Sequence, residues 1–183
     1  MPEPRGFLLI DKPSGCSSFD VVRGLRKLTG IRRIGHTGTL DPFATGLLIC
    51  ALGSATRLCG YLEAEDKTYS ATLRLGSQTN TGDTEGDFLR EDGPIPDKLD
   101  EAFLRERVFE LKELSPPQHS ALKVNGRPAY DYARKGEKLD LAPRPVRISK
   151  FGVLNYDPPD LTYVCRVSKG TYIRSLSEYI AGC

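Results

Sequence analysis

The chain has 183 residues and a formal net charge of +2, and 39% of its residues are hydrophobic. This length and composition suit one globular domain that can bury a core, with room for a small appendage. No apolar run approaches the ~20 residues of a membrane-spanning helix, and the N-terminal segment lacks the long apolar stretch of a signal peptide. We therefore expect a cytoplasmic protein with no membrane partner.

Five cysteines are scattered along the chain without a CxxC pair. An odd, scattered set argues against a disulfide framework, and it fits no usual zinc spacing. We therefore interpret these residues as buried or spare thiols: Cys16, Cys50, Cys59, Cys165 and Cys183.

Charge is unevenly distributed along the chain. Residues 11–36 hold six basic and two acidic residues, and residues 123–150 hold eight basic and three acidic residues. Between them, residues 83–113 hold five basic and eleven acidic residues. Folding could join the two basic segments into one surface that faces phosphates. Ordinary solvated surface would look the same in the sequence, so charge alone leaves both interpretations open.

The first 30 residues predict a strand and then a helix. The apolar run at residues 7–10 indicates the strand, and a DKPSG turn follows it. Ser17 or Ser18 can cap a helix that continues to residue 28, and Gly30 suits its end. One side of this helix is apolar, whereas its other side carries three cations, Arg23, Arg26 and Lys27.

Residues 35–76 predict a loop, a strand, a short helix and a second strand. Residues 35–46 are rich in glycine and threonine and form the loop, and the apolar residues 47–52 indicate a buried strand. Ser54 is a candidate cap for the short helix. Residues 68–76 alternate apolar and polar side chains, which is typical of a strand with one buried face.

The rest of the chain again mixes helices with strands. A polar loop covers residues 77–87, and Asp97 or Asp100 can cap a helix that runs to residue 108. The pair Asn125-Gly126 is a hairpin signal. The remaining elements are a short helix from Pro128 to Gly136, strands at residues 145–156 and 161–167, and a helix at residues 171–180. Strands and helices do not alternate regularly, which favours an α+β fold with a mixed, mostly antiparallel sheet flanked by helices.

The segment GHTGTLDPFATG, residues 35–46, places a single carboxylate, Asp41, directly before a proline. Pro42 has a fixed backbone angle and disfavours a helical conformation at Asp41, so the carboxylate would stand on a stiff turn. The glycines around it would let a ligand approach the backbone closely. The alternative is a carboxylate that caps its own turn through Thr37 or Thr39. The segment lacks the glycine-lysine order of a nucleotide phosphate loop.

Three further side chains could join this carboxylate. Tyr69 lies in KTY on the mainly apolar face of its strand, where a core aromatic residue would look the same. Arg174 follows SKGTY and could instead form a surface pair with Glu178, four residues along a helix. His36 is the only histidine near this set, and it could hold the loop through a hydrogen bond or contact a phosphate or a base.

Five motifs stand in order over about residues 6–180: LLIDKPSGCSS, GHTGTLDPFATGLL, KTYSATLRLGSQTNTGD, SALKVNGRPAYDYARKGE and SKGTYIRSL. Together they resemble the bacterial TruB-type tRNA pseudouridine synthases. One such motif would be a weak signal, but five in order are highly specific. The third motif looks like the stand-alone bacterial enzymes, so we expect no guide RNA.

The resemblance implies a pseudouridine synthase fold and the isomerisation of uridine to pseudouridine in the T-arm of tRNA, at position 55. It implies an RNA-binding monomer that uses no cofactor and no metal. Asp41 falls on the catalytic aspartate of the family, and Arg174 falls on the arginine that pairs with this aspartate. Tyr69 falls on the tyrosine that packs against the target base and is a candidate proton acceptor.

Four more positions match the family's motifs. His36 and Tyr172 fall on residues that contact RNA or substrate. Lys12 and Pro13 fall on a motif that supports the active-site loop. These roles follow from the resemblance alone.

In the family, the chain continues with the rest of the catalytic domain and usually with a PUA-type RNA-binding domain. Neither part maps onto this sequence, which stops at Cys183. We therefore expect residues 1–183 to form the catalytic domain without its C-terminal part and without the PUA-type domain. A competing interpretation is an RNA-binding or chaperone remnant that binds a stem-loop without forming pseudouridine.

Overall fold

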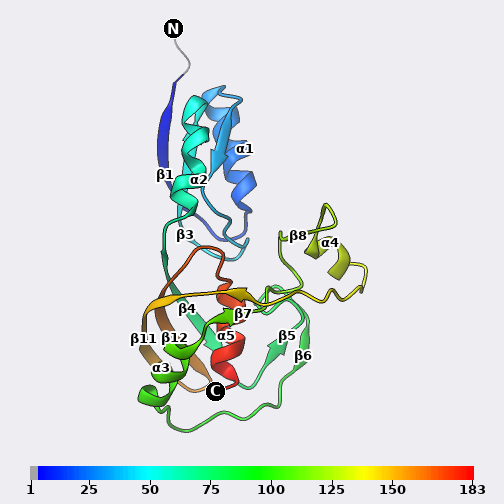
Figure 1. Ribbon diagram of the computed structural model, residues 1–183. Coiled ribbons are helices and arrows are strands. Elements are labelled where there is room, and N and C mark those ends of the chain that lie inside the picture. Colours follow the sequence, from blue (N-terminus) through cyan, green and yellow to red (C-terminus); the bar gives the residue numbers. More distant parts are fainter. Residues whose placement is uncertain (1–3) are drawn as a thin grey trace. The chain divides into compact units, whose positions relative to one another are not determined.

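The computed structural model describes residues 4–183. The chain divides into two compact units, one that ends at Glu65 and one that begins at Asp66 (Figure 1). Both units combine helices with antiparallel strands, which confirms the predicted α+β class. That residues 1–183 correspond to one catalytic domain stays a prediction.

The first unit is built on a three-stranded antiparallel sheet. Its strands are β1 (Gly6–Lys12), β2 (Ile34–His36) and β3 (Gly46–Leu52), with β3 in the middle. Helix α1 (Ser18–Thr29) covers one face of this sheet, because Val22 of the helix is buried together with Leu48 and Cys50 of β3. Alternation along the strands therefore selects the face that meets the helix.

Helix α1 has the two ends that the sequence predicts. Ser17 is its N-cap, and the Ser17 hydroxyl accepts a hydrogen bond from the backbone N–H of Asp20 while the Asp20 carboxylate accepts one from the backbone N–H of Ser17. This reciprocal arrangement is a capping box. The helix ends at Gly30, whose φ of 71° is a left-handed conformation that glycine adopts at low cost.

The short helical segment after β3 differs from the prediction. It consists of the 3₁₀ helix η1 (Gly53–Leu58) and α2 (Cys59–Glu63), and the N-cap position of η1 is Leu52 rather than Ser54. Gly53 has a φ of 57° and turns the chain directly out of β3. Ser54 therefore lies inside the first helical turn, so the expected cap was wrong.

The second unit is built on the antiparallel sheet β11-β12-β4. Its strands are β4 (Lys67–Arg74), β11 (Ile148–Asp157) and β12 (Asp160–Val167), and β12 lies in the middle. Helices α3 (Glu101–Glu110) and α5 (Ile173–Ala181) contribute to one core with the sheet. The buried members of that core come from both helices and from β11 and β12: Leu104, Val108, Ile148, Phe151, Leu161, Tyr163, Cys165, Val167, Leu176 and Ile180.

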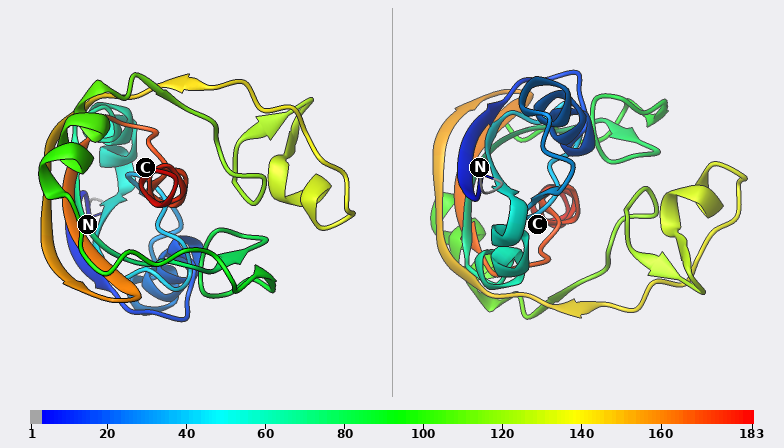
Figure 2. Two further views of the ribbon diagram at one scale, coloured as in Figure 1. Left: turned by 90° about the horizontal axis from the view of Figure 1, so that it is seen from below. Right: turned by 90° about the horizontal axis from the view of Figure 1, so that it is seen from above.

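Short paired strands complete the second unit. They form three two-stranded sheets: β5 (Gln78–Thr79) with β6 (Phe88–Arg90), β7 (Glu113–Leu114) with β10 (Arg144–Pro145), and β8 (Lys123–Val124) with β9 (Arg127–Pro128). The predicted hairpin at Asn125-Gly126 is confirmed, since it joins β8 to β9 with φ angles of 50° and 80°. Helix α4 (Ala129–Ala133) follows, and both views in Figure 2 show this hairpin and α4 standing apart from the β11-β12-β4 sheet.

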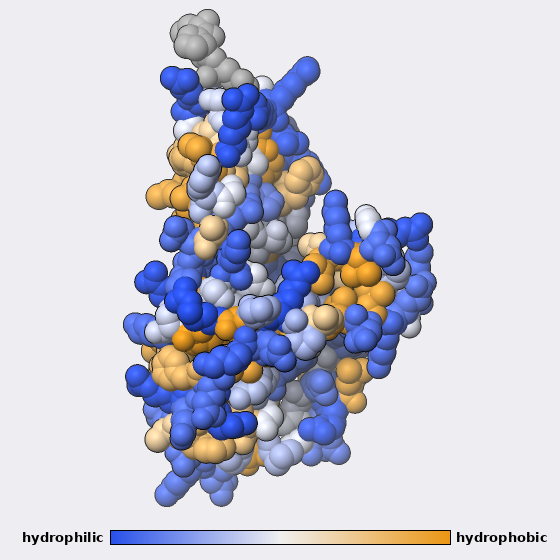
Figure 3. Space-filling view, in the orientation of Figure 1, coloured by the Kyte–Doolittle hydropathy of each residue, from blue (hydrophilic) through white to orange (hydrophobic). Residues whose placement is uncertain are grey.

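One face of the molecule is mainly polar. Figure 3 shows a predominantly hydrophilic face with smaller hydrophobic areas over both units. None of the helices in the described part of the chain is long and apolar enough to cross a bilayer.

Candidate active site

Lys12 connects the end of β1 to the loop that carries Asp41. Its side chain is fully buried. The ammonium nitrogen Nζ donates to the backbone carbonyl oxygens of Pro13 at 2.9 Å, Cys16 at 2.7 Å and Pro42 at 3.1 Å. An ammonium group has three donors, so these carbonyls satisfy all of them. Because a buried charge without partners would be costly, this arrangement holds the DKPSG turn against the residue that follows Asp41.

Further hydrogen bonds fix the same loop from the start of α1. The Ser18 hydroxyl accepts from the backbone N–H of Leu40 at 3.0 Å and lies 3.3 Å from the Leu40 carbonyl oxygen, to which it can donate. The backbone N–H of Gly15 donates to the Pro42 carbonyl oxygen at 2.9 Å. The neighbours of Asp41 on both sides are therefore tied to the segment between β1 and α1.

Asp41 itself lies half-buried in a turn, as the sequence predicts. Its backbone carbonyl oxygen accepts from the N–H of Ala44 at 3.1 Å. Thr37, at the start of the same loop, is buried, and its N–H donates to the Ile49 carbonyl oxygen of β3 at 2.9 Å. The loop is thus anchored at its beginning, in its middle and at its end.

His36 is the last residue of β2 and lies opposite Cys50 of β3. Its ring nitrogen Nδ1 lies 2.7 Å from the carbonyl oxygen of Gly38. A carbonyl oxygen only accepts, so Nδ1 carries the proton of this bond, and in the neutral ring Nε2 is the acceptor nitrogen. His36 therefore shapes the loop that leads to Asp41. An RNA contact through Nε2 stays a prediction.

Tyr69 lies in β4, where the alternation of exposed and half-buried residues is as predicted. Its Cα is paired with that of Cys165 in β12. The ring packs against the core of the second unit and remains half-buried. It therefore contributes to the core, as a structural aromatic would, and keeps accessible surface for another partner.

Arg174 lies in the first turn of α5, and its side chain is 9% exposed. Its guanidinium group donates from Nη1 to the carbonyl oxygen of Thr81 at 2.8 Å and from Nη2 to that of His119 at 2.9 Å. The carboxylate of Asp83, itself 7% exposed, lies 3.5 Å from Nη1. The alternative of a solvent-exposed pair with Glu178 is therefore wrong, because the guanidinium group is buried among loop residues.

Asp83 organises the loop between β5 and β6, and sequence reasoning missed it. Its Oδ1 accepts from the Thr81 hydroxyl at 2.6 Å and from the backbone N–H of Glu85 at 3.0 Å. The sequence shows only a polar loop here. The one feature that could have pointed to Asp83 is its place directly after Gly82. The relationship with Arg174 appears only when the fold brings α5 to this loop.

Gly82 and Glu178 complete the surroundings of Arg174. Gly82 has a φ of +71°, and a Cβ atom there would lie 3.2 Å from Glu178 Oε1 and 3.6 Å from the Cβ of Arg174. Both the backbone angle and the close approach of α5 favour glycine at this position. Partial burial raises the pKa of the Glu178 carboxyl, and the Arg174 guanidinium opposes that rise. The site is thus a desolvated group of charges.

Tyr172 and Pro13 each contribute a backbone carbonyl oxygen within their own unit. Tyr172 is the N-cap residue of α5, and its carbonyl oxygen accepts from the N–H of Leu176 at 3.1 Å. Pro13 presents its carbonyl oxygen to Lys12. The predicted residues therefore fall into two groups. Lys12, Pro13, His36 and Asp41 lie in the first unit, and Tyr69, Tyr172 and Arg174 lie in the second unit.

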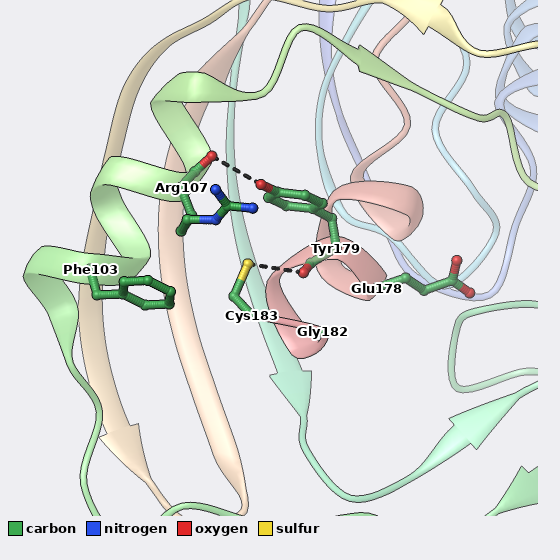
Figure 4. A pocket seen from close by; sticks show the side chains of 6 residues that line it. All are labelled: Phe103, Arg107, Glu178, Tyr179, Gly182 and Cys183. Carbon is green, nitrogen blue, oxygen red and sulfur yellow. Dashed lines mark hydrogen bonds between the residues drawn. The ribbon is translucent and has the colours of Figure 1, made fainter.

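An open hollow of about 480 Å³ lies between α3 and the end of α5. Figure 4 shows the side chains that line it. The Tyr179 hydroxyl donates to the carbonyl oxygen of Arg107 at 3.1 Å, and the Cys183 thiol donates to that of Tyr179 at 3.3 Å. The Glu178 carboxylate points away from the other lining side chains (Figure 4). None of the residues predicted for catalysis lines this hollow. Its lining residues are Phe103, Arg107, Glu178, Tyr179, Gly182 and Cys183. Within residues 4–183, no group of three or more His, Cys, Asp and Glu side chains could hold a metal ion.

Two solved structures align with this chain over almost all of its length. A Cbf5-Nop10-Gar1 complex aligns with a TM-score of 0.68 and 27% identity, and covers 96% of this chain and 43% of that chain. An H/ACA RNP bound to a substrate RNA containing 2'-deoxyuridine aligns with a TM-score of 0.64 and 26% identity, over 96% of this chain and 42% of that chain. The class of protein is therefore that of the pseudouridine synthase fold.

The family follows from sequence comparison. The model of the family described as "TruB family pseudouridylate synthase (N terminal domain)" matches residues 26–173. The tRNA pseudouridine synthase B of Thermobifida fusca (strain YX) is 47% identical over 94% of this chain and 62% of that protein. The protein of the same name in Bordetella pertussis (strain Tohama I) is 42% identical over 97% of this chain and 75% of that protein. The chain belongs to the TruB family, and it spans about three fifths of the length of the first of these relatives.

Proposed function

We propose that the protein isomerises uridine to pseudouridine in tRNA, in the T-arm at position 55. The observation that carries the proposal is the buried Lys12 ammonium group, which bonds the Pro42 carbonyl 30 positions along the chain and so fixes the loop that presents Asp41. Support also comes from membership of the TruB family and from relatives that are named tRNA pseudouridine synthase B. Residues 1–183 would belong to the catalytic domain.

The reaction requires that the target nucleotide leave its stack. A uridine inside folded RNA cannot reach a protein side chain at its glycosidic bond until it is flipped out. The Asp41 carboxylate then acts as a nucleophile at the sugar or at the base. The bond from the sugar C1′ to N1 of the base breaks, and a bond from C1′ to C5 forms. The C5 proton is released and N1 gains a proton, so the product is an isomer of the substrate.

The other predicted residues support this step. Arg174 would pair with Asp41, and the buried position of its guanidinium group makes it a fixed positive charge. The half-buried ring of Tyr69 would give the flipped base a stacking face. His36 and Tyr172 would contact the RNA, while Lys12 and Pro13 hold the loop. The reaction as proposed uses no cofactor, no metal and no guide RNA, and it takes place on a monomer in the cytoplasm.

The experiment measures tritium release from a T-arm stem-loop that carries uridine labelled at carbon 5. The unchanged chain should release tritium, and Asp41→Asn should release none while its melting temperature stays close to that of the unchanged chain. Asp157→Asn removes an exposed carboxylate at the end of β11 and is the matched control, with full release expected. Full activity of Asp41→Asn would overturn the proposed mechanism.

A second arm locates the modified position. Carbodiimide treatment and primer extension on a full tRNA should show a stop at position 55 and at no other uridine. Stem-loop binding by the unchanged chain without any tritium release would instead support the RNA-binding or chaperone interpretation. Release from an unrelated hairpin as fast as from the T-arm would argue against T-arm specificity.

A further inference from the structure

The outer side of α1 carries an aromatic ring close to two guanidinium groups. Phe19 is 51% exposed, and the Cζ atoms of Arg23 and Arg26 lie 5.6 Å and 5.7 Å from the centre of its ring. The residues of α1 that face the core are Val21, Val22 and Leu25, so Phe19 is on another side of the helix. Ring and cations therefore form one surface feature, the Phe19 cluster, defined by Phe19, Arg23 and Arg26.

The Phe19 cluster is held in place before any ligand binds. Arg26 donates from Nη2 to the carbonyl oxygen of Ile34 in β2 at 3.1 Å, which ties its guanidinium group across to the sheet. Arg23 lies 2.9 Å from the Asp20 carboxylate. Asp20 also caps the helix through Ser17, and these hydrogen bonds, followed by Arg23, lower the pKa of its carboxyl. A ring in contact with two cations that are themselves held loses little conformational freedom when it binds.

The charge that follows Asp20 along the sequence is of one sign. Between Asp20 and Asp41 the sequence contains five Lys and Arg residues and no acidic residue. They are all exposed: Arg23, Arg26, Lys27, Arg32 and Arg33. Aromatic rings and guanidinium planes are the surfaces on which unpaired bases stack, and neighbouring cations bind the phosphates between those bases. The chemistry that complements the cluster is therefore that of an unstacked nucleotide.

The cluster is continuous with the loop that carries Asp41. Ser18, which precedes Phe19, makes both of its side-chain hydrogen bonds to Leu40, which precedes Asp41. Phe19 and Asp41 each directly follow one of the two residues that these hydrogen bonds join. A nucleic acid that reaches Asp41 has the start of α1 beside it.

We propose that the Phe19 cluster is an RNA contact, in which Phe19 stacks on an unpaired nucleotide of the substrate and Arg23 and Arg26 bind its phosphates. This inference rests on the proposed function, because it takes the substrate to be a tRNA stem-loop. It assigns α1 a role in binding the RNA outside the target nucleotide. It predicts an effect on RNA affinity and KM, with kcat unchanged.

The experiment measures the affinity of the full chain for a fluorescently labelled T-arm stem-loop by anisotropy, from 50 to 200 mM salt. Phe19→Ala and Phe19→Leu should each weaken binding about tenfold, because only a ring offers a stacking face. Phe19→Tyr keeps that face and should bind within about twofold of the unchanged chain. Arg23→Gln should lower the slope of log affinity against log salt by about 1.

Leu28→Ala is the matched control. Leu28 is an apolar residue of the same helix, 83% exposed, nine positions from Phe19 and thus on the opposite edge of the exposed side. The affinity of Leu28→Ala for the stem-loop should equal that of the unchanged chain. On a blunt RNA duplex without unpaired nucleotides, Phe19→Ala should bind as well as the unchanged chain. Melting temperatures of all variants confirm that they are folded.

The outcomes separate this inference from the proposed function. Tritium release with equal stem-loop affinity of Phe19→Ala and the unchanged chain overturns the RNA contact alone. Binding that depends on Phe19 without any tritium release overturns the proposed function and retains the contact. Equal losses in Phe19→Leu, Phe19→Tyr and Leu28→Ala would show a general hydrophobic effect and would also overturn it. If the unchanged chain binds no stem-loop, both are overturned.

Discussion

The ammonium nitrogen of Lys12 lies 3.1 Å from the backbone carbonyl oxygen of Pro42, and the two residues are 30 positions apart. Pro42 directly follows Asp41, so a charged side chain at the end of β1 sets the backbone beside the proposed nucleophile. Lys12 carries out this role without contacting solvent, since its side chain is fully buried.

Lys12→Met should destabilise the protein and abolish isomerisation. The change removes the ammonium donor from the carbonyl oxygens of Pro13, Cys16 and Pro42. Pro42 keeps the backbone N–H of Gly15 at 2.9 Å, and each carbonyl that is left unsatisfied costs about 1–3 kcal/mol. We expect a loss of roughly 3 kcal/mol in the free energy of unfolding, measured with urea, after partial relaxation. Lys98→Met removes an exposed lysine and is the control, with no change expected. An active and stable Lys12→Met variant would contradict the role of the ammonium group.

Arg174→Ala should cost folding stability as well as activity. It leaves the Asp83 carboxylate buried without its cation, and such a loss typically costs about 3–5 kcal/mol. Adding Asp83→Asn removes the unpaired charge, so the double variant should regain part of the stability without regaining tritium release. Urea unfolding and the release assay measure the two effects on the same samples. A double variant no more stable than Arg174→Ala would mean that the Arg174–Asp83 pair is not the reason for the loss.

Tyr69 offers a test that separates its ring from its hydroxyl group. If the ring stacks on the flipped base and the hydroxyl moves a proton, Tyr69→Phe should keep the RNA affinity and lose about 100-fold in rate, a typical contribution of general base catalysis. Tyr69→Leu should lose both affinity and rate, because it removes the stacking face. Stopped-flow binding and single-turnover release give the two numbers. A fully active Tyr69→Phe would remove the hydroxyl from the mechanism.

The buried thiol of Cys165 should make the protein less stable in alkali. Burial raises the pKa of Cys165 from 9.0 to about 11 in the folded protein. Below pH 9 both states keep the proton, so this thiol has no effect. Above pH 9 the unfolded chain releases it first, and stability falls by up to about 1.4 kcal/mol per pH unit until pH 11. Cys165→Ala should reduce this slope in urea titrations between pH 9 and 11, and an unchanged slope would contradict the assignment.

Local signals predicted much of the fold. The helix cap at Ser17, the alternation along β4 and the Asn125-Gly126 turn depend only on neighbours in the sequence, and all of them are present. The short pairs β5-β6 and β7-β10 were not predicted as strands. Strands of two or three residues carry no pattern of their own, and they form because the fold brings their partners together.

The candidate site divides in the same way. Motifs indicated Asp41, Lys12 and Arg174, and the structure shows what holds the Asp41 loop. Asp83 could not be found, because its significance depends on Arg174, whose guanidinium group reaches the same loop across 93 positions of sequence. The exposed pair of Arg174 with Glu178 was a wrong alternative for a related reason. Spacing along a helix predicts which side chains can meet, but not which of them the rest of the chain buries.

The contacts of Lys12 and Ser18 also determine what could be transplanted. A protein engineer who moved the twelve residues from Gly35 to Gly46 into another scaffold would carry the carboxylate but leave its supports behind. The smallest portable piece is the continuous chain from the start of β1 to the end of β3, because every tie to Leu40 and Pro42 described above originates inside it. The loop that carries Asp41 therefore keeps its structure only as part of the whole β-α-β-β segment, and the loop alone would not keep it.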